Sequence, residues 1–293
     1  MFSVAFAGSF LRVLRRNCKT MNNEMVSVIE EMKKDADYAN RYFSLKELFE
    51  GLSDICEAAD RKIVLMIDEV DSAANNQVFI DFLAQLRAQY LDREFYPGFQ
   101  SVILAGVYDI KNLKRKLRPE EGHRYNSPWN IAADFSIEMS FSESEIAGML
   151  QEYESDHRTG MNISKMSELL YAYTAGYPFL VSRICQLMDE RVRDEYENLK
   201  LVWTENGFNE AVRILLAEKN PLFESLVGKI CDYPELSVML KTLLFTGRNI
   251  AYNPDETSID MAQMFGFIKN QNGNVVIANR IFETRLYNYY LTE

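Results

Sequence analysis

The chain is poor in cysteine and histidine. Its four cysteines lie far apart and form no CxxC pair, and neither of the two histidines has a second ligand at metal-binding spacing. Neither a disulfide framework nor a zinc site is therefore expected. Reduced thiols among apolar neighbours are typical of a cytoplasmic protein. The residues concerned are Cys18, Cys56, Cys185, Cys231, His123 and His157.

Positive charge and long apolar runs are also scarce. The sequence has 43 acidic and 32 basic residues among 293, a formal net charge of −11, which repels nucleic acid and anionic lipid unless basic groups gather on one face. The apolar run Met1–Phe10 is too short for a membrane span, and its arginines follow it, whereas a signal peptide carries its charge in front. We expect a cytoplasmic protein with no membrane partner.

The first half of the chain has the pattern of an α/β layer. Ser44 and Glu47 have capping-box spacing before an apolar stripe of helical period. The solid apolar run Ile63–Ile67 is typical of a strand buried on both faces of a parallel sheet. A second short strand is predicted at Val102–Ala105 and a third at Phe135–Phe141.

The second half is predicted to be helical, with a small hairpin near its end. Helices follow a capping box at Ser142, and a proline at the first position of a helix follows Asn220. Asn272 and Gly273 supply the tight turn of a hairpin, and a last helix is expected after it, which together outline a winged helix. The predicted domains are an α/β core, a helical lid and a winged helix, at residues 1–141, 142–219 and 220–293.

Two carboxylates, Asp68 and Glu69, directly follow the first predicted strand. They are expected at the carboxyl edge of the sheet, where open α/β folds bind their ligands. In nucleotide hydrolases such a pair holds magnesium and orients the attacking water. In the other interpretation, Asp68 caps the next helix and Glu69 is a solvated loop acid. The pair alone does not decide between them.

Four separated motifs together carry a resemblance. Ile63–Asp71, Ser101–Asp109, Ser127–Ile131 and Gly176–Leu180 occur in the order and at about the spacing found in bacterial AAA-like ATPases, which are related to the archaeal-type and STAND signalling ATPases. The resemblance covers most of the chain. It implies a partial P-loop NTPase-type parallel sheet with helices, followed by a helical lid and a C-terminal winged helix.

The resemblance also implies roles for individual residues. Asp68 and Glu69 correspond to the Walker B acids, Asp68 as the magnesium ligand and both as catalytic residues. Gly176 and Pro178 match the Gly-x-Pro motif that lies against the nucleotide base in STAND proteins. A helix end followed by a proline helix start explains those two residues equally well. The intact family is expected to use ATP and Mg²⁺.

The phosphate-binding loop of that family is missing. Gly-x-x-x-x-Gly-Lys-Ser/Thr does not occur, and the single Gly-Lys pair, Gly228-Lys229, is followed by Ile230. By comparison with the family, Met1 corresponds to a position near the helix after the second strand, so we expect a truncation rather than a mutated loop. We therefore expect no site in this chain that binds the phosphates of ATP, and whether the chain is an enzyme stays open.

The truncation predicts an incomplete sheet. The strands at Ile63–Ile67 and Val102–Ala105 should have unpaired edges and an uncovered apolar face, which makes the region Met1–Phe141 less stable and prone to associate. As an alternative, Met1–Ala7 pairs as an edge strand and fills the gap. The basic run Lys111–Arg118 could bind phosphate or give an arginine finger to a neighbouring subunit, but a solvated helix face is the expected role.

Three functional hypotheses follow. The first is a nucleotide-dependent switch or motor of the AAA-like class, inactive alone because it lacks the phosphate loop. The second is a non-enzymatic winged-helix module that binds protein or nucleic acid, and the third is a pseudo-ATPase scaffold. Tyr233–Glu293 contains five basic and six acidic residues, which gives DNA binding no electrostatic support. Protein partners or self-association are therefore expected.

Overall fold

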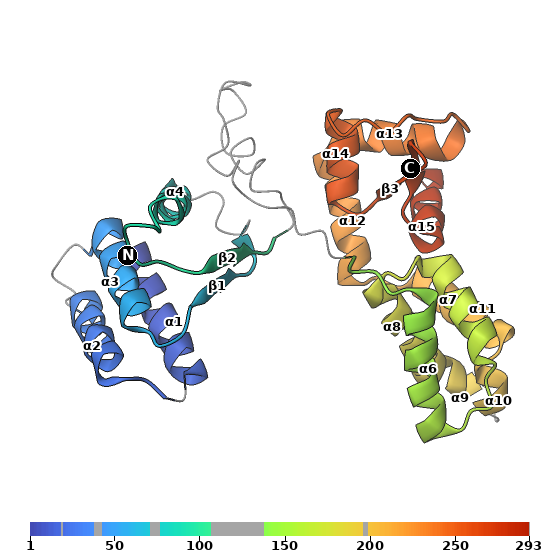
Figure 1. Cartoon of the computed structure of the whole chain (residues 1–293). Coiled ribbons are helices and arrows are strands. Elements are labelled where there is room, and N and C mark those ends of the chain that lie inside the picture. Colours follow the sequence, from blue (N-terminus) through green and yellow to red (C-terminus); the bar gives the residue numbers. More distant parts are fainter. Residues whose placement is uncertain (19, 38–42, 71–76, 107–137, 196–198, 293) are drawn as a thin grey trace. The chain divides into compact units, whose positions relative to one another are not determined.

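The computed structural model describes residues 1–18, 20–37, 43–70, 77–106, 138–195 and 199–292. Its contacts divide the chain into two compact units, Met1–Asp134 and Phe135–Glu293, here called the N-terminal and C-terminal units (Figure 1). None of the helices among the described residues has the length and the apolar character of a membrane span.

The described part of the N-terminal unit contains helices and two short strands. In chain order these are α1 (Phe2–Asn17), α2 (Asn23–Asp37), α3 (Leu45–Ala58), β1 (Val64–Ile67), α4 (Gln77–Leu91) and β2 (Ser101–Leu104). Helix α3 begins at the predicted capping box. The backbone N–H of Glu47 donates to the Ser44 hydroxyl at 3.2 Å, and the N–H of Ser44 donates to the Glu47 carboxylate at 2.7 Å. The predicted helix start is confirmed.

Strands β1 and β2 form a two-stranded parallel sheet in the described part of the chain. The register runs from Val64 opposite Ser101 to Ile67 opposite Leu104. Helix α4 lies between the two strands in the sequence, as a parallel connection requires. The predicted strand–helix–strand order is therefore confirmed.

The sheet buries one face and exposes the other. Leu65 is 7% exposed and packs with the apolar side chains of the surrounding helices. Val64, Met66 and Ile103 remain 43%, 71% and 40% exposed. The prediction that Ile63–Ile67 is buried on both faces is wrong, because the described helices build their core on the Leu65 side. Among the described residues no side chain buries the face that carries Val64, Met66 and Ile103.

Helix α1 is held in the unit by aromatic packing. The ring centroids of Phe2 and Phe6 lie 5.4 Å and 4.6 Å from that of Phe82, whose side chain is fully buried. Each such aromatic pair adds about 0.5–1.5 kcal/mol beyond the burial of its area. Residues four apart are separated by about 6 Å along a helix but by about 13 Å along a strand, so both rings reach Phe82 because they lie on a helix. The alternative of an edge strand at Met1–Ala7 is therefore wrong.

The C-terminal unit is mainly helical. Its first part contains α6 (Glu143–His157), α7 (Ile163–Thr174), α8 (Pro178–Leu187), the π-helical turn η3 (Met188–Val192), α9 (Arg193–Glu195), α10 (Leu199–Val202) and α11 (Glu205–Ala217). Its second part contains α12 (Pro221–Asp232), α13 (Pro234–Phe245), α14 (Thr257–Met264), β3 (Ile268–Gln271), β4 (Asn274–Ile277) and α15 (Arg280–Leu291). Helix α6 begins at the predicted capping box of Ser142 and Glu145.

The predicted hairpin is present, and the described part of the predicted third strand is not a strand. Strands β3 and β4 pair antiparallel across a turn in which Asn272 and Gly273 have φ values of 53° and 79°, as a tight hairpin turn requires. Of the strand predicted at Phe135–Phe141, residues 135–137 lie outside the described residues and the rest is not a strand. There the N–H of Phe141 donates instead to the carbonyl of Gly176 at 2.8 Å.

One hydrophobic core runs through the C-terminal unit from α6 to α15. Helix α15 contributes to it from the end of the chain. The Phe282 ring packs against Tyr177 at 5.5 Å, and the Arg285 guanidinium donates to the carbonyl of Leu216 at the end of α11. The last helix is thereby tied to the first part of the unit, and the division into a lid and a winged helix at residue 219 stays a prediction.

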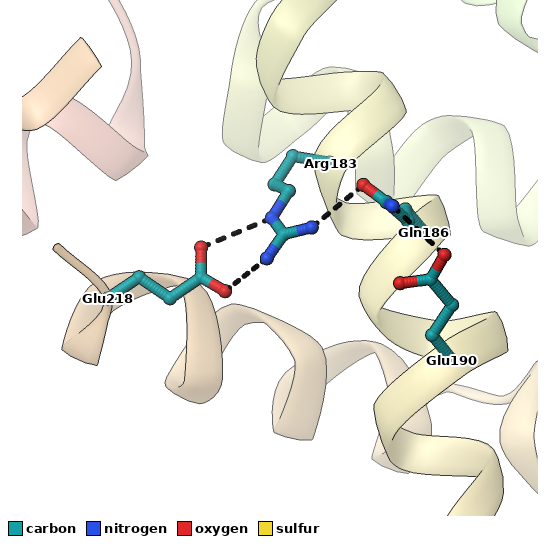
Figure 2. A network of polar contacts seen from close by, with 4 residues as sticks. All are labelled: Arg183, Gln186, Glu190 and Glu218. Atoms are coloured by element: carbon teal, nitrogen blue, oxygen red, sulfur yellow. Dashed lines mark hydrogen bonds and ion pairs between the residues drawn. The ribbon is translucent and has the colours of Figure 1, made fainter. Parts of the chain in front are cut away.

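A polar network joins α8 to the end of α11 (Figure 2). Arg183 on α8 donates to both carboxylate oxygens of Glu218, the residue that follows α11. The distance from Nε of Arg183 to Oε2 of Glu218 is 3.2 Å. It also donates to Gln186 at 2.7 Å, which in turn donates to Glu190 at 2.9 Å. The two charged side chains of the pair are only 27% and 20% exposed, so solvent screens them less than a surface pair.

Candidate functional site

Asp68 and Glu69 lie at the carboxyl end of β1, in a turn that ties this strand to β2. The N–H of Glu69 donates to Oδ1 of Asp68 at 2.8 Å, and the N–H of Val70 donates to the carbonyl of Ala105 at 3.0 Å. Glu69 has a φ of 53°, in the left-handed region that non-glycine residues seldom adopt. This turn returns Val70 to the core, where it is 3% exposed, and leaves both carboxylates exposed.

The pair can supply oxygen ligands to a hard cation. Magnesium commonly takes one or two carboxylates, keeps several waters and completes its shell with phosphate oxygens. With Oδ1 of Asp68 bonded to the Glu69 N–H, its second carboxylate oxygen and the Glu69 carboxylate are the groups that fit this role. Among the described residues, no group of three or more His, Cys, Asp or Glu side chains is placed to hold a metal. The carboxylates fit magnesium, whereas a phosphate-binding loop is absent from the sequence.

Gly176 occupies a position that only glycine fits. Its φ is 75°, and a Cβ atom built there would lie 1.9 Å from the carbonyl oxygen of Phe141. The N–H of Gly176 donates to the Thr174 hydroxyl at 3.1 Å, and Thr174 ends α7. Pro178 is the first residue of α8, a position where its missing N–H costs nothing. This packing is a sufficient reason for both residues, without a ligand.

The two pairs of predicted site residues lie in different units. Asp68 and Glu69 belong to the N-terminal unit, and Gly176 and Pro178 to the C-terminal unit. The basic run Lys111–Arg118 and the motif Ser127–Ile131 lie outside the described residues. So does His123, while His157 stacks on Tyr153 with ring centroids 4.0 Å apart.

Sequence reasoning missed a groove between α6 and α7. It has a volume of about 760 Å³ and a lining of hydroxyl, apolar and acidic side chains. Four serines are the only signal for it in the sequence: Ser142 is the N-cap of α6, and Ser144 and Ser164 each lie two residues after the N-cap of their helix. The lining residues are Ser142, Glu143, Ser144, Ala147, Ile163, Ser164, Ser167 and Tyr171.

Comparison with solved structures gives a match over nearly the whole chain. The Walker-type ATPase PABY2304 of Pyrococcus abyssi is similar with a TM-score of 0.58 and 13% sequence identity, over 97% of this chain and 77% of that one. No protein-family profile and no curated protein matches the sequence. At this identity the likeness shows the fold. The chain has a mostly helical α/β fold of the kind found in a Walker-type ATPase, with a small parallel sheet.

Proposed function

We propose that this chain is part of a nucleotide-dependent switch or motor of the bacterial AAA-like, STAND-related class, and that it does not turn over ATP alone. The observation that carries the proposal is the position of Asp68 and Glu69. They follow one of two paired parallel strands, at the sheet edge where α/β folds place their ligands, in a fold similar to that of a Walker-type ATPase. No phosphate loop accompanies them.

Each acid has a separate role in this proposal. Asp68 is oriented by the Glu69 N–H, which leaves its second carboxylate oxygen for magnesium. Magnesium, when bound with ATP, neutralises the charge of the phosphates. The exposed Glu69 carboxylate is the group that orients and polarises a water. The phosphates themselves need a holder from outside these residues, so no turnover is expected from this chain.

Metal binding tests the proposal without turnover. Mn²⁺, used in place of Mg²⁺, should broaden the amide NMR signals at the ends of β1 and β2, because a paramagnetic ion relaxes nearby protons. Asp68→Asn should abolish this broadening, whereas Glu69→Gln should largely preserve it. Asp92→Asn, which changes an exposed acid elsewhere in the same unit, is the matched control. Broadening that Asp68→Asn leaves unchanged would contradict the assignment.

Turnover is measured on the same proteins. The chain should release no more phosphate from ATP with Mg²⁺ than its Glu69→Gln variant does, because nothing in it positions the γ-phosphate. A Mg²⁺-dependent rate that Glu69→Gln removes would show that the chain is active alone. That result would overturn the proposal that the chain is inactive alone, but it would support the roles assigned to Asp68 and Glu69.

The alternative is a binding module that works through a winged helix. Helices α12, α13 and α14 precede the β3–β4 hairpin, and Ala251 bridges to Asn274 beside it, which supports a third, very short strand. The N–H of Val275 donates to the carbonyl of Ile250 at 2.9 Å, and the N–H of Tyr252 to that of Gly273 at 2.8 Å. This order of elements supports a winged-helix arrangement.

The charge of the winged-helix region favours a protein partner over DNA. This holds whether the chain is a nucleotide-dependent switch or a pseudo-ATPase scaffold. Helix α14, which precedes the hairpin, carries Asp260 and no basic residue. DNA binding measured by fluorescence anisotropy should be weak and should vanish at moderate salt. Nanomolar binding at physiological salt that Lys269→Ala weakens would restore the nucleic-acid alternative. Arg280 is less suitable for this test, because its guanidinium packs over the Tyr173 ring at 4.3 Å.

A cytoplasmic location is part of the same proposal. All four cysteines are free, which is the usual state in a reducing compartment.

A further inference from the structure

Strand β1 has an outer edge with which no described strand pairs. The carbonyls of Ile63 and Ile67 accept hydrogen bonds from the β2 side at 2.8 Å and 2.9 Å. Because backbone groups alternate in direction along a strand, the N–H and C=O groups of Val64 and Met66 point away from β2. Their side chains are 43% and 71% exposed. The edge therefore offers both hydrogen-bonding groups and apolar surface to a further strand.

The residues around β1 carry opposite charges at the two ends of the strand. Arg61 and Lys62 precede it and Asp68 and Glu69 follow it, all four exposed. The pattern is symmetric about Leu65, since Lys62 and Asp68 are equally far from it, and so are Arg61 and Glu69. Among the described residues none of the four takes part in an ion pair. A second strand with the same sequence, running the opposite way, would meet opposite charges at both ends.

We propose that two copies of this chain associate through the outer edge of β1, antiparallel, with the two Leu65 residues facing each other at a two-fold axis. Val64 of one copy then lies opposite Met66 of the other, and their outward backbone groups form hydrogen-bonded pairs on both sides of the axis. The result is a four-stranded sheet in the order β2, β1, β1, β2. The interface is isologous and closes, so it gives a dimer and not a fibre.

The side chains support the same register. Val64 and Met66 lie on the exposed face of the sheet, so the two pairs join the apolar faces of both copies into one continuous strip. Lys62 of each copy comes beside Asp68 of the other, and Arg61 beside Glu69. The edge of β2 offers no such complement, because the residues that flank it, Phe99–Gln100 and Ala105–Gly106, are uncharged. The association goes beyond the proposed function and involves no nucleotide.

A charge swap tests the register. Lys62→Glu places two acids together at each end of the pairing, and Asp68→Lys places two cations together, so each variant alone should associate at least about tenfold more weakly in sedimentation velocity. An equimolar mixture of the two should regain the association of the parent chain, since every end then has opposite charges. Arg61→Glu with Glu69→Lys is a second swap pair, for use where Asp68→Lys fails to fold.

An edge substitution provides the matched control. Met66→Lys adds a charge on the exposed face at the edge of β1 and should abolish the dimer. Val13→Lys also replaces an exposed apolar residue by lysine, at a 57% exposed position on α1, and should leave the dimer unchanged. Three results would overturn the inference: a parent chain that stays monomeric at all concentrations, a dimer that Met66→Lys does not weaken, or folded swap variants whose mixture does not regain association.

Discussion

The contact between Gly176 and Phe141 makes a sharp prediction for the C-terminal unit. In Gly176→Ala, the new Cβ atom would lie 1.9 Å from the carbonyl oxygen of Phe141, far inside van der Waals contact. That oxygen belongs to backbone, which cannot swing aside as a flexible side chain does. The segment before α6 must therefore move away from the turn between α7 and α8.

The magnitude follows from two costs. An L-residue at a φ of 75° is held in the left-handed region, at about 1–2 kcal/mol. Movement of Phe141 also breaks the hydrogen bond from its N–H to the Gly176 carbonyl, 2.8 Å long, which is about 0.5–1.5 kcal/mol. With residual crowding, Gly176→Ala should lower the free energy of unfolding by about 2–4 kcal/mol, well above the usual loss of about 1 kcal/mol for a point substitution.

Urea unfolding of the C-terminal unit measures this loss. The sequence has two tryptophans, so in a Trp129→Phe background the fluorescence comes from Trp203 alone, which is 3% exposed in the core of that unit. Gly148→Ala is the matched control, because its Cβ would meet no atom within 4 Å in the interior of α6. That substitution should raise stability by about 0.5–1 kcal/mol.

One result would refute the reasoning. If Gly176→Ala unfolds within about 1 kcal/mol of the parent chain, the close approach does not constrain the residue. A role against a nucleotide base would then be the better reason for the glycine, and the variant should lose nucleotide binding while it keeps its stability. A large loss of stability in the absence of any ligand supports the packing reason.

Three further predictions concern both units. Arg183→Ala should lower the free energy of unfolding in urea by about 1–2 kcal/mol, because it removes charge-assisted hydrogen bonds from the half-buried Glu218 carboxylate. Arg213→Ala, in a pair whose arginine is 69% exposed, should change that free energy by less than about 0.5 kcal/mol. Equal effects of the two substitutions would contradict the burial argument. At pH 8 a thiol reagent should label the exposed Cys231 before Cys56 and Cys185, because burial raises the pKa of both of these thiols to about 12 and so depletes their thiolates. Equal labelling rates of the three cysteines in the folded chain would contradict this prediction. In a monomeric sample the amides of β1 and β2 should exchange with deuterium faster than those of α8, since each strand has one paired edge within the described part of the chain. Uniformly slow exchange would show a complete sheet.

Local features of the fold were predictable from the sequence because their causes lie within a few residues. A capping box needs only Ser44 and Glu47, and a tight hairpin turn needs only Asn272 and Gly273, residues that tolerate positive φ. The position of Asp68 and Glu69 after a strand is equally local. For these elements the chemistry of neighbouring side chains decides the backbone.

The parts that failed depend on neighbours distant in the sequence. The run Ile63–Ile67 has the composition of a strand covered on both faces, but its covering depends on which helices pack there, and Met66 is 71% exposed. In the same way, the apolar start of the chain fits an edge strand or a helix, and the buried ring of Phe82 decides for the helix.

By itself, then, the sequence determined the strand–helix–strand order of the first unit, the capped helix starts and the presence of two adjacent acids after a strand. Only the tertiary structure decided how these acids are held, with Glu69 at a φ of 53° and its N–H donating to Asp68, because the hydrogen bond from the Val70 N–H to Ala105, the residue after β2, constrains the turn. It also decided that Gly176 faces the backbone of Phe141. Such contacts arise when segments distant in the sequence pack together, and no local pattern of residues encodes them.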